Sequence, residues 1–131
     1  MRVHEPYEYA IVRLVPRVDR EEFINVGVIL RCASRGFLDA CVELDEARVR
    51  ALAPSLDLQV VKTHLDSFVA IARGGKQAGP IGQLSSSERF HWLVATRSTM
   101  IQTSAVHTGR CTDPESKMQR LIDEMVRTPR E

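Results

Sequence analysis

The sequence has few cysteines, and their spacing argues against the usual cysteine-based scaffolds. Among 131 residues there are three, namely Cys32, Cys41 and Cys111. Their number is odd and no pair has C-x-x-C spacing, so we expect neither a disulfide framework nor a structural zinc site. Reduced thiols, as in a cytoplasmic protein, are the expectation.

The sequence also lacks a long hydrophobic run and an excess of either charge. No segment approaches the ~20 apolar residues that a membrane-spanning helix requires, and charged residues occupy the N-terminus where a signal peptide would be apolar. The 18 basic and 17 acidic side chains leave a net charge of +1, and aromatic residues make up only 5% of the chain. Nucleic-acid binding is therefore disfavoured, and we expect a cytoplasmic protein with no membrane association.

The motifs of common catalytic and cofactor chemistry are missing as well. The four histidines have no mutual spacing typical of metal ligands, and the glycines form no phosphate-binding loop between a strand and a helix. No G-x-S-x-G motif or cysteine–histidine nucleophile pair is evident. We therefore predict no metal, no cofactor and no catalytic residue, and the sequence leaves open whether the protein is an enzyme.

Hydrophobic residues make up 44% of the chain, and their alternation predicts a sheet near the N-terminus. Strands are predicted at residues 7–15, 23–33 and 37–44, joined by short connections as in an antiparallel meander. In the second strand, one face is predicted to hold Ile24, Val26, Val28, Leu30 and Cys32. Gly27, in the middle of that strand, indicates a bulge or a close approach by another backbone or a ligand.

The rest of the chain is predicted to be mainly helical. Apolar residues at helical spacing predict helices at residues 46–53, 58–73 and 114–127. Residues 74–84 contain four glycines and are predicted to form a flexible loop. Ser85 and Glu88 fit a capping box that begins a short helix, in which Trp92 is predicted to be a core residue.

A late polar segment completes the predicted fold. Residues 97–108 are rich in β-branched residues and polar on both faces, which is typical of an edge strand or a strand lining a cleft. We therefore predict one α+β domain over residues 1–131, with its core at about 7–126. Its antiparallel sheet has about four strands, and the two longer helices pack on it.

Two polar residues of the first two strands are candidates for a site. Arg13 lies in mid-strand among apolar residues, where a charge is costly unless it is paired or solvated. It either forms a salt bridge within the protein, for instance to Glu8, Glu22 or Glu43, or contacts an anion at a cleft. Asn25 either satisfies the backbone of a bulge or loop, or presents its amide to a ligand or partner.

The late polar strand supplies the remaining candidates. Its arginines, histidine and hydroxyl groups suit a phosphate or carboxylate, although an exposed strand end has the same composition. His107 would also serve as an acid–base group, because the ordinary pKa of histidine is near neutrality. The candidate ligand-binding residues are Arg13, Asn25, Arg97, Ser98, His107, Thr108 and Arg110.

Five segments along the chain carry a family resemblance. They are Tyr7-Glu8-Tyr9-Ala10, Val15-Pro16-Arg17, Glu22-Phe23-Ile24-Asn25-Val26-Gly27-Val28, Arg97-Ser98-Thr99 and Val106-His107-Thr108-Gly109. Together they resemble domain-of-unknown-function family 3037, a bacterial family of small single-domain proteins, over about residues 7–126. The resemblance implies no catalytic residues, and it suggests a HipA-like kinase as a partner. Family relatives are expected to have proline where this chain has Thr96 and Ala105, so the backbone beside the polar strand is expected to be less rigid here.

Two functions follow from these observations. The leading hypothesis is a non-enzymatic interaction module that acts through a protein partner or as a homo-oligomer, because no complete catalytic set is present. The alternative is a small enzyme or sensor that binds an anionic ligand, phosphorylated or nucleotide-like, through Arg13, Arg97, His107 and Arg110. This alternative requires those side chains to converge on one hollow.

Overall fold

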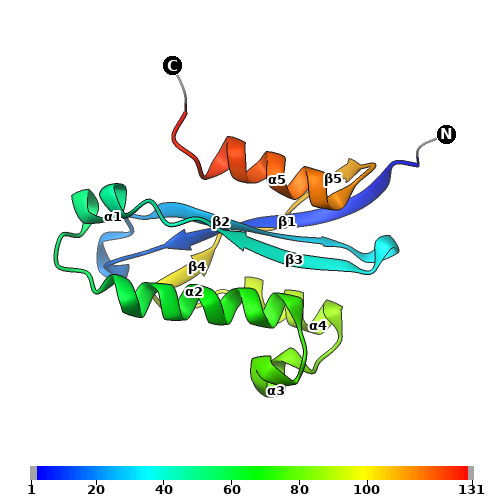
Figure 1. The fold of residues 1–131 in the computed structure, drawn as a ribbon, viewed down its shortest axis with the longest axis horizontal. Coiled ribbons are helices and arrows are strands. Elements are labelled where there is room, and N and C mark those ends of the chain that lie inside the picture. Colours follow the sequence, from blue (N-terminus) through cyan, green and yellow to red (C-terminus); the bar gives the residue numbers. More distant parts are fainter. Residues whose placement is uncertain (1–2, 130–131) are drawn as a thin grey trace.

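A computed structural model describes residues 3–129 of the chain (Figure 1). The strands are β1 (Glu5–Leu14), β2 (Ile24–Cys32), β3 (Phe37–Val42), β4 (Ile101–Thr103) and β5 (His107–Cys111). The α-helices are α1 (Glu46–Leu52), α2 (Leu58–Arg73), α3 (Gly79–Gly82), α4 (Ser86–Val94) and α5 (Pro114–Met125). Short 3-10 turns are η1 (Val18–Arg20), η2 (Ala33–Arg35) and η3 (Lys76–Ala78). The predicted α+β class is confirmed.

The five strands form one antiparallel sheet in which β1 is central. One edge of β1 pairs with β2, which pairs with β3, so the predicted N-terminal meander is confirmed. The other edge of β1 pairs with β4 near its end and with β5 near its start. The sheet has five strands where about four were predicted, because the late polar segment is interrupted between β4 and β5.

A buried serine holds the interrupted edge against β1. The Ser104 amide donates to the Ile11 carbonyl at 2.9 Å, and the Ile11 amide donates to Ser104 Oγ at 2.8 Å. Ser104 is 7% exposed, so its hydroxyl replaces a backbone carbonyl as the acceptor for a buried amide. β4 and β5 therefore act as one edge that is broken in the middle but remains attached to β1.

A bulge in β2 inverts its alternation. Val12 lies opposite Gly27 and Arg13 lies opposite Asn25, which leaves Val26 as an extra residue. The single face predicted for β2 is therefore wrong, because side chains before and after the bulge point to different sides of the sheet. The predicted close approach at Gly27 is confirmed, since a Cβ there would lie 2.6 Å from the Cys41 carbonyl oxygen.

Two hydrophobic cores cover the two faces of the sheet. The larger joins α2 and α4 to one face, on which lie Ala10, Val12, Leu14, Ile24, Val26 and Ile29. The smaller joins α5 to the other face, on which lie Tyr7, Ile11, Val28, Leu30, Cys32 and Cys111. Figure 1 shows α5 on one side of the sheet and α2 and α4 on the other. α5 packs chiefly against β2 and β3.

The predicted first residues of most helices are confirmed by their N-terminal caps. Asp57 caps α2, Asp113 caps α5, and Ser85 with Glu88 forms the predicted capping box of α4. The glycine-rich segment predicted as a loop instead contains η3 and α3, and the Gly75 amide closes it by donating to the Gly82 carbonyl. Trp92 is 40% exposed, so its prediction as a core residue is wrong.

Candidate functional site

Three of the seven candidate residues lie on the α5 side of the sheet. Arg13 in β1 is directly opposite Asn25 in β2, and His107 in β5 is opposite Tyr9 in β1. Arg13 and Tyr9 alternate with the β1 residues that face α2, so they point the other way. Arg13 and His107 are thus four residues apart along β1, about 13 Å at 3.3 Å per residue.

The other four candidates lie elsewhere. Arg97 and Ser98 are in the connection between α4 and β4, where the Arg97 guanidinium stacks 4.5 Å from the Trp92 ring and donates to the Trp92 carbonyl. Thr108 and Arg110 are exposed in β5, opposite residues of β1 that share the α2 side of the sheet. The structure therefore brings Arg13 and Asn25 together, leaves His107 farther along the same face, and separates the rest.

Arg13 has no carboxylate partner in residues 3–129. Its guanidinium instead stacks over the Phe23 ring, 4.2 Å from the ring centre. Each carboxylate considered as its partner binds another arginine: Glu8 pairs with Arg31 at 2.9 Å, Glu22 with Arg20 at 2.5 Å, and Glu43 with Arg127 at 2.6 Å. The salt bridge considered for Arg13 is therefore not formed within the described residues.

Asn25 connects the bulge to the end of α5. Its Nδ2 donates to the Met125 carbonyl at 3.0 Å, which is one of the carbonyls that a helix terminus leaves unpaired. This contact is of the structural kind considered for Asn25. Its Oδ1 and the Arg13 Nε are both buried, and neither has a hydrogen-bond partner in the described part of the chain.

The sheet face beside α5 is only partly covered. α5 packs chiefly on β2 and β3 and also buries Tyr7, Ile11 and Cys111, but it leaves other residues of this face accessible. These accessible residues, here called the open face, are Tyr9, Arg13, Phe23, Asn25, Gln102 and His107. Phe23 is 45% exposed, and Met125 at the adjoining end of α5 is 39% exposed.

The other arginines near the end of α5 are already engaged. Arg127 donates to Glu43 and, at 3.5 Å, to Asp123, and its hydrogen bond is the largest cause of a lowered Glu43 pKa. Arg48 Nη1 donates to the Val126 carbonyl at 3.1 Å. Arg13 is therefore the arginine at this end of the open face whose charge no described carboxylate compensates.

His107 lies in an aromatic environment. Its ring lies 5.3 Å from that of Tyr9, which in turn lies 5.9 Å from that of Tyr7. Within residues 3–129, no three histidine, cysteine, aspartate or glutamate side chains gather as metal ligands would. Over the same residues, no helix has the length and apolar character needed to cross a bilayer.

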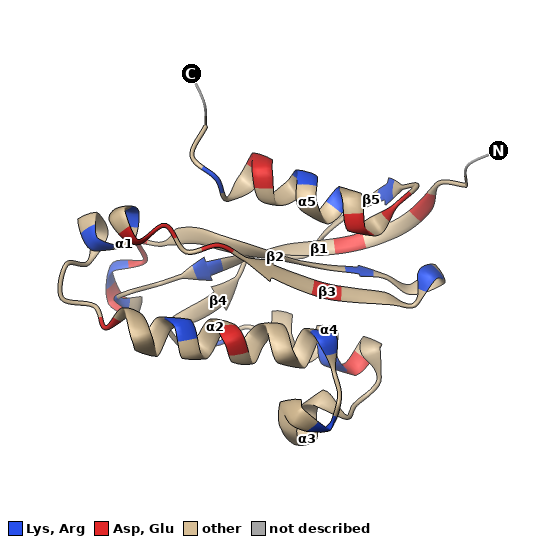
Figure 2. Cartoon of the chain, in the orientation of Figure 1, with Lys and Arg blue, Asp and Glu red and all other residues tan. Residues whose placement is uncertain are grey.

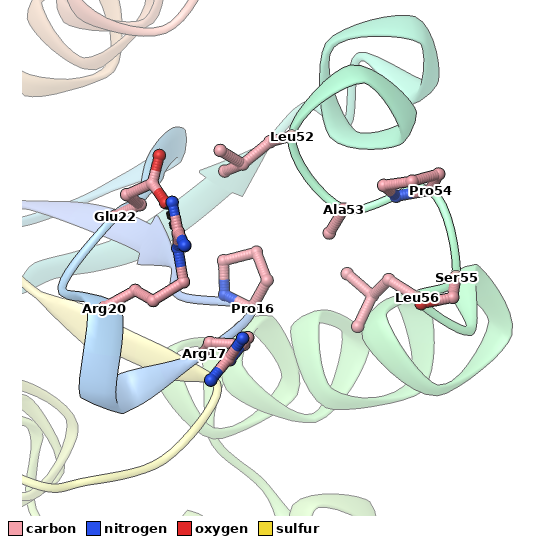
Figure 3. Close-up of a pocket in the computed structure, with 9 residues that line it drawn as sticks. All are labelled: Pro16, Arg17, Arg20, Glu22, Leu52, Ala53, Pro54, Ser55 and Leu56. Atoms are coloured by element: carbon pink, nitrogen blue, oxygen red, sulfur yellow. Dashed lines mark hydrogen bonds and ion pairs between the residues drawn. The ribbon is translucent and has the colours of Figure 1, made fainter.

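Two hollows lie away from the open face. One, of about 420 Å³, separates the connection after β1 from the α1–α2 turn (Figure 3). Its lining is Pro16, Arg17, Arg20, Glu22, Leu52, Ala53, Pro54, Ser55 and Leu56, and none of these is a predicted site residue. The other, of about 390 Å³, is lined by Arg97, Trp92 and residues of α2, and not by Arg13, His107 or Arg110.

Phe23 and Met125 were missed as parts of a site. A signal existed for Phe23, because it shares the alternation of Asn25 and so was predictable on the side of Arg13. Met125 lies in the helix predicted at residues 114–127. Nothing local connects it with Asn25, which is 100 positions earlier.

Charge over the whole molecule is mixed. Figure 2 shows basic residues spread over the sheet and both helical layers and interspersed with acidic ones.

A family model described as "Protein of unknown function (DUF3037)" matches residues 9–126 of the chain. Neither the curated proteins nor the solved structures contain a match.

Proposed function

The chain belongs to the DUF3037 family of proteins of unknown function, and from its geometry we propose that it is a non-enzymatic protein-interaction module. One observation carries this proposal, namely that α5 leaves the part of its sheet face around Phe23 and Arg13 uncovered. This uncovered part presents a half-exposed Phe23 beside an arginine without a described counter-ion. Arginine and aromatic residues are enriched among those that dominate the free energy of protein–protein binding.

The separation of the candidate groups favours binding over catalysis. A catalytic base must come within hydrogen-bond reach of the proton that it removes, and the residues that stabilise charge must lie close by. Arg97 lines a hollow on the α2 side, whereas the backbone positions of Arg13 and His107 are about 13 Å apart along the other side. The enzyme or sensor hypothesis required these residues to converge, so it receives no support from this geometry.

The family resemblance suggests the partner. We propose a HipA-like kinase encoded in the same genome, and a second copy of this chain is the alternative. Either partner would cover Phe23 and the adjoining end of α5. Size-exclusion chromatography with light scattering on the two purified proteins, alone and mixed, tests both, and the expected result is a complex or an oligomer.

Matched variants connect that result with the open face. Phe23→Ser is expected to weaken the complex at least about ten-fold, because aromatic anchors carry much of an interface's free energy. Trp92→Ser is the control, since Trp92 is an aromatic residue of similar exposure, 40% against 45%, on the other side of the sheet. A monomer that binds neither the kinase nor itself would refute the proposal.

A further inference from the structure

We infer that Arg13 is the docking residue for an acidic side chain, aspartate or glutamate, of the protein partner. This inference rests on the proposed interaction function and names the chemistry of the surface that the open face would bind. It concerns one guanidinium, the ring on which it stacks, and the end of α5.

An anion would complement Arg13, because no described carboxylate pairs with it in the free protein. Its Nε is buried without an acceptor, so part of the guanidinium is removed from water. The aromatic ring of Phe23 stabilises the cation through its face but does not neutralise it. The terminal nitrogens are not among the buried unpaired atoms, and they make no hydrogen bond to any residue from 3 to 129. They can therefore receive an external acceptor.

A carboxylate fits this position better than a phosphate does. Phosphate groups carry close to two negative charges and are typically bound by clusters of arginines. Here the neighbouring Arg127 is neutralised by Glu43, Arg48 donates to a carbonyl, and His107 is about 13 Å away. One guanidinium matches one carboxylate, and its planar fork matches the two carboxylate oxygens.

A protein segment fits better than a free small molecule. Arg13 lines neither of the two hollows described above, and the ring on which it stacks, Phe23, is 45% exposed. Small molecules are generally bound in concave sites that bury most of their surface. The surroundings of Arg13 are instead the half-exposed Phe23 and Met125, which suit an acidic residue flanked by apolar residues.

The first experiment uses the protein without its partner. The Arg13 Nε resonance is followed by NMR while the protein is titrated with N-acetylglutamate α-amide, N-acetylglutamine α-amide or inorganic phosphate. We expect a saturable shift with the glutamate compound, little shift with the neutral glutamine compound, and a smaller shift with phosphate. A larger response to phosphate would overturn the carboxylate assignment, and no response to any of the three would overturn the inference.

The second experiment uses the complex. Arg13→Met keeps a long side chain over Phe23 but removes the charge, and we expect at least about ten-fold weaker binding to the kinase. Arg13→Lys keeps the charge without the fork and is expected to bind with intermediate affinity. Wild-type binding is expected to weaken with added NaCl much more than Arg13→Met binding does.

The two proposals fail in different ways. If wild type binds its partner and Arg13→Met binds equally well, the inference fails while the interaction function stands. If wild type binds nothing but the Arg13 resonance responds selectively to glutamate, the interaction function and the assignment to a partner fail together, and only carboxylate binding at Arg13 is supported. Because the NMR titration uses wild-type protein, a folding defect in a variant does not affect it.

Discussion

At the scale of single residues, Arg13 is a charge that the free protein does not compensate. Buried polar groups are normally hydrogen-bonded, so the unpaired Nε of Arg13 calls for an explanation. We predict that Arg13→Met raises the free energy of unfolding by about 1 kcal/mol, because it removes an unpaired buried donor and retains apolar contact with Phe23. Urea unfolding followed by circular dichroism measures this change.

The control for this prediction is Arg20→Met. Arg20 is exposed and paired with Glu22, so its replacement is expected to change the free energy of unfolding by less than about 0.5 kcal/mol. If Arg13→Met instead destabilises the protein by more than about 1 kcal/mol, Arg13 has a structural role and the residue-scale account is wrong.

Gly27 is a second residue whose identity the fold requires. A Cβ at this position would lie 2.6 Å from the Cys41 carbonyl oxygen and 2.8 Å from Val42 Cγ1. Gly27→Ala is therefore expected to lower the free energy of unfolding by about 2 kcal/mol or more. Gly36→Ala, where an added Cβ meets nothing within 4 Å but φ is +61°, should lose only about 1 kcal/mol. Equal losses in thermal or urea unfolding would contradict the steric explanation.

At the scale of elements, the edge formed by β4 and β5 depends on one hydroxyl. Ser104→Ala removes the acceptor of the buried Ile11 amide, and an unsatisfied buried amide costs about 1–3 kcal/mol. We expect a loss of that size, with faster hydrogen exchange at the Ile11 amide. Ser98→Ala, at an exposed serine of the preceding connection, is the control and should change stability by less than about 0.5 kcal/mol.

The end of α5 is attached to the connection after β3 by an ion pair that titrates. Arg127 holds the pKa of Glu43 below its ordinary value of 4.5, so the folded state binds this proton less readily than the unfolded state. The stabilisation is present above 4.5 and is lost as the pH falls through the lowered folded-state pKa. Glu43→Gln should therefore flatten the acid side of the stability profile measured by urea unfolding. An unchanged slope would contradict the role of this pair.

At the scale of the whole molecule, local sequence signals predicted the helices, but the sequence did not predict strand register or ion-pair partners. The predicted helix at 58–73 is confirmed as Leu58–Arg73, because its apolar period and its Asp57 cap are both local. The face inversion in β2 depends on how β2 registers with β1, which alternation within β2 cannot show. The sequence also could not show that Arg13 lacks a carboxylate partner, because this depends on which arginine reaches each carboxylate in the folded chain.

The candidate site residues show the same difference between local signals, which were predictive, and long-range contacts, which were not. Arg13 and Asn25 stood out as polar residues in apolar strands, and the pairing of β1 with β2 places them opposite each other. Arg97 had a plausible composition for the same site, but its connection directs it to Trp92 on the other side of the sheet. The overall arrangement is therefore a two-faced sheet with one face incompletely covered at Phe23 and Arg13, which is the feature from which the proposed interaction function follows.

The most direct measurement compares Phe23→Ser with Trp92→Ser in binding to the HipA-like kinase, with self-association measured in parallel by light scattering. Both variants remove a partly exposed aromatic ring, but only Phe23 lies on the open face. We predict that Phe23→Ser loses at least about ten-fold in affinity and that Trp92→Ser binds like wild type. Equal affinity in the two variants, or a greater loss for Trp92→Ser, would contradict the central claim that the open face is the binding surface.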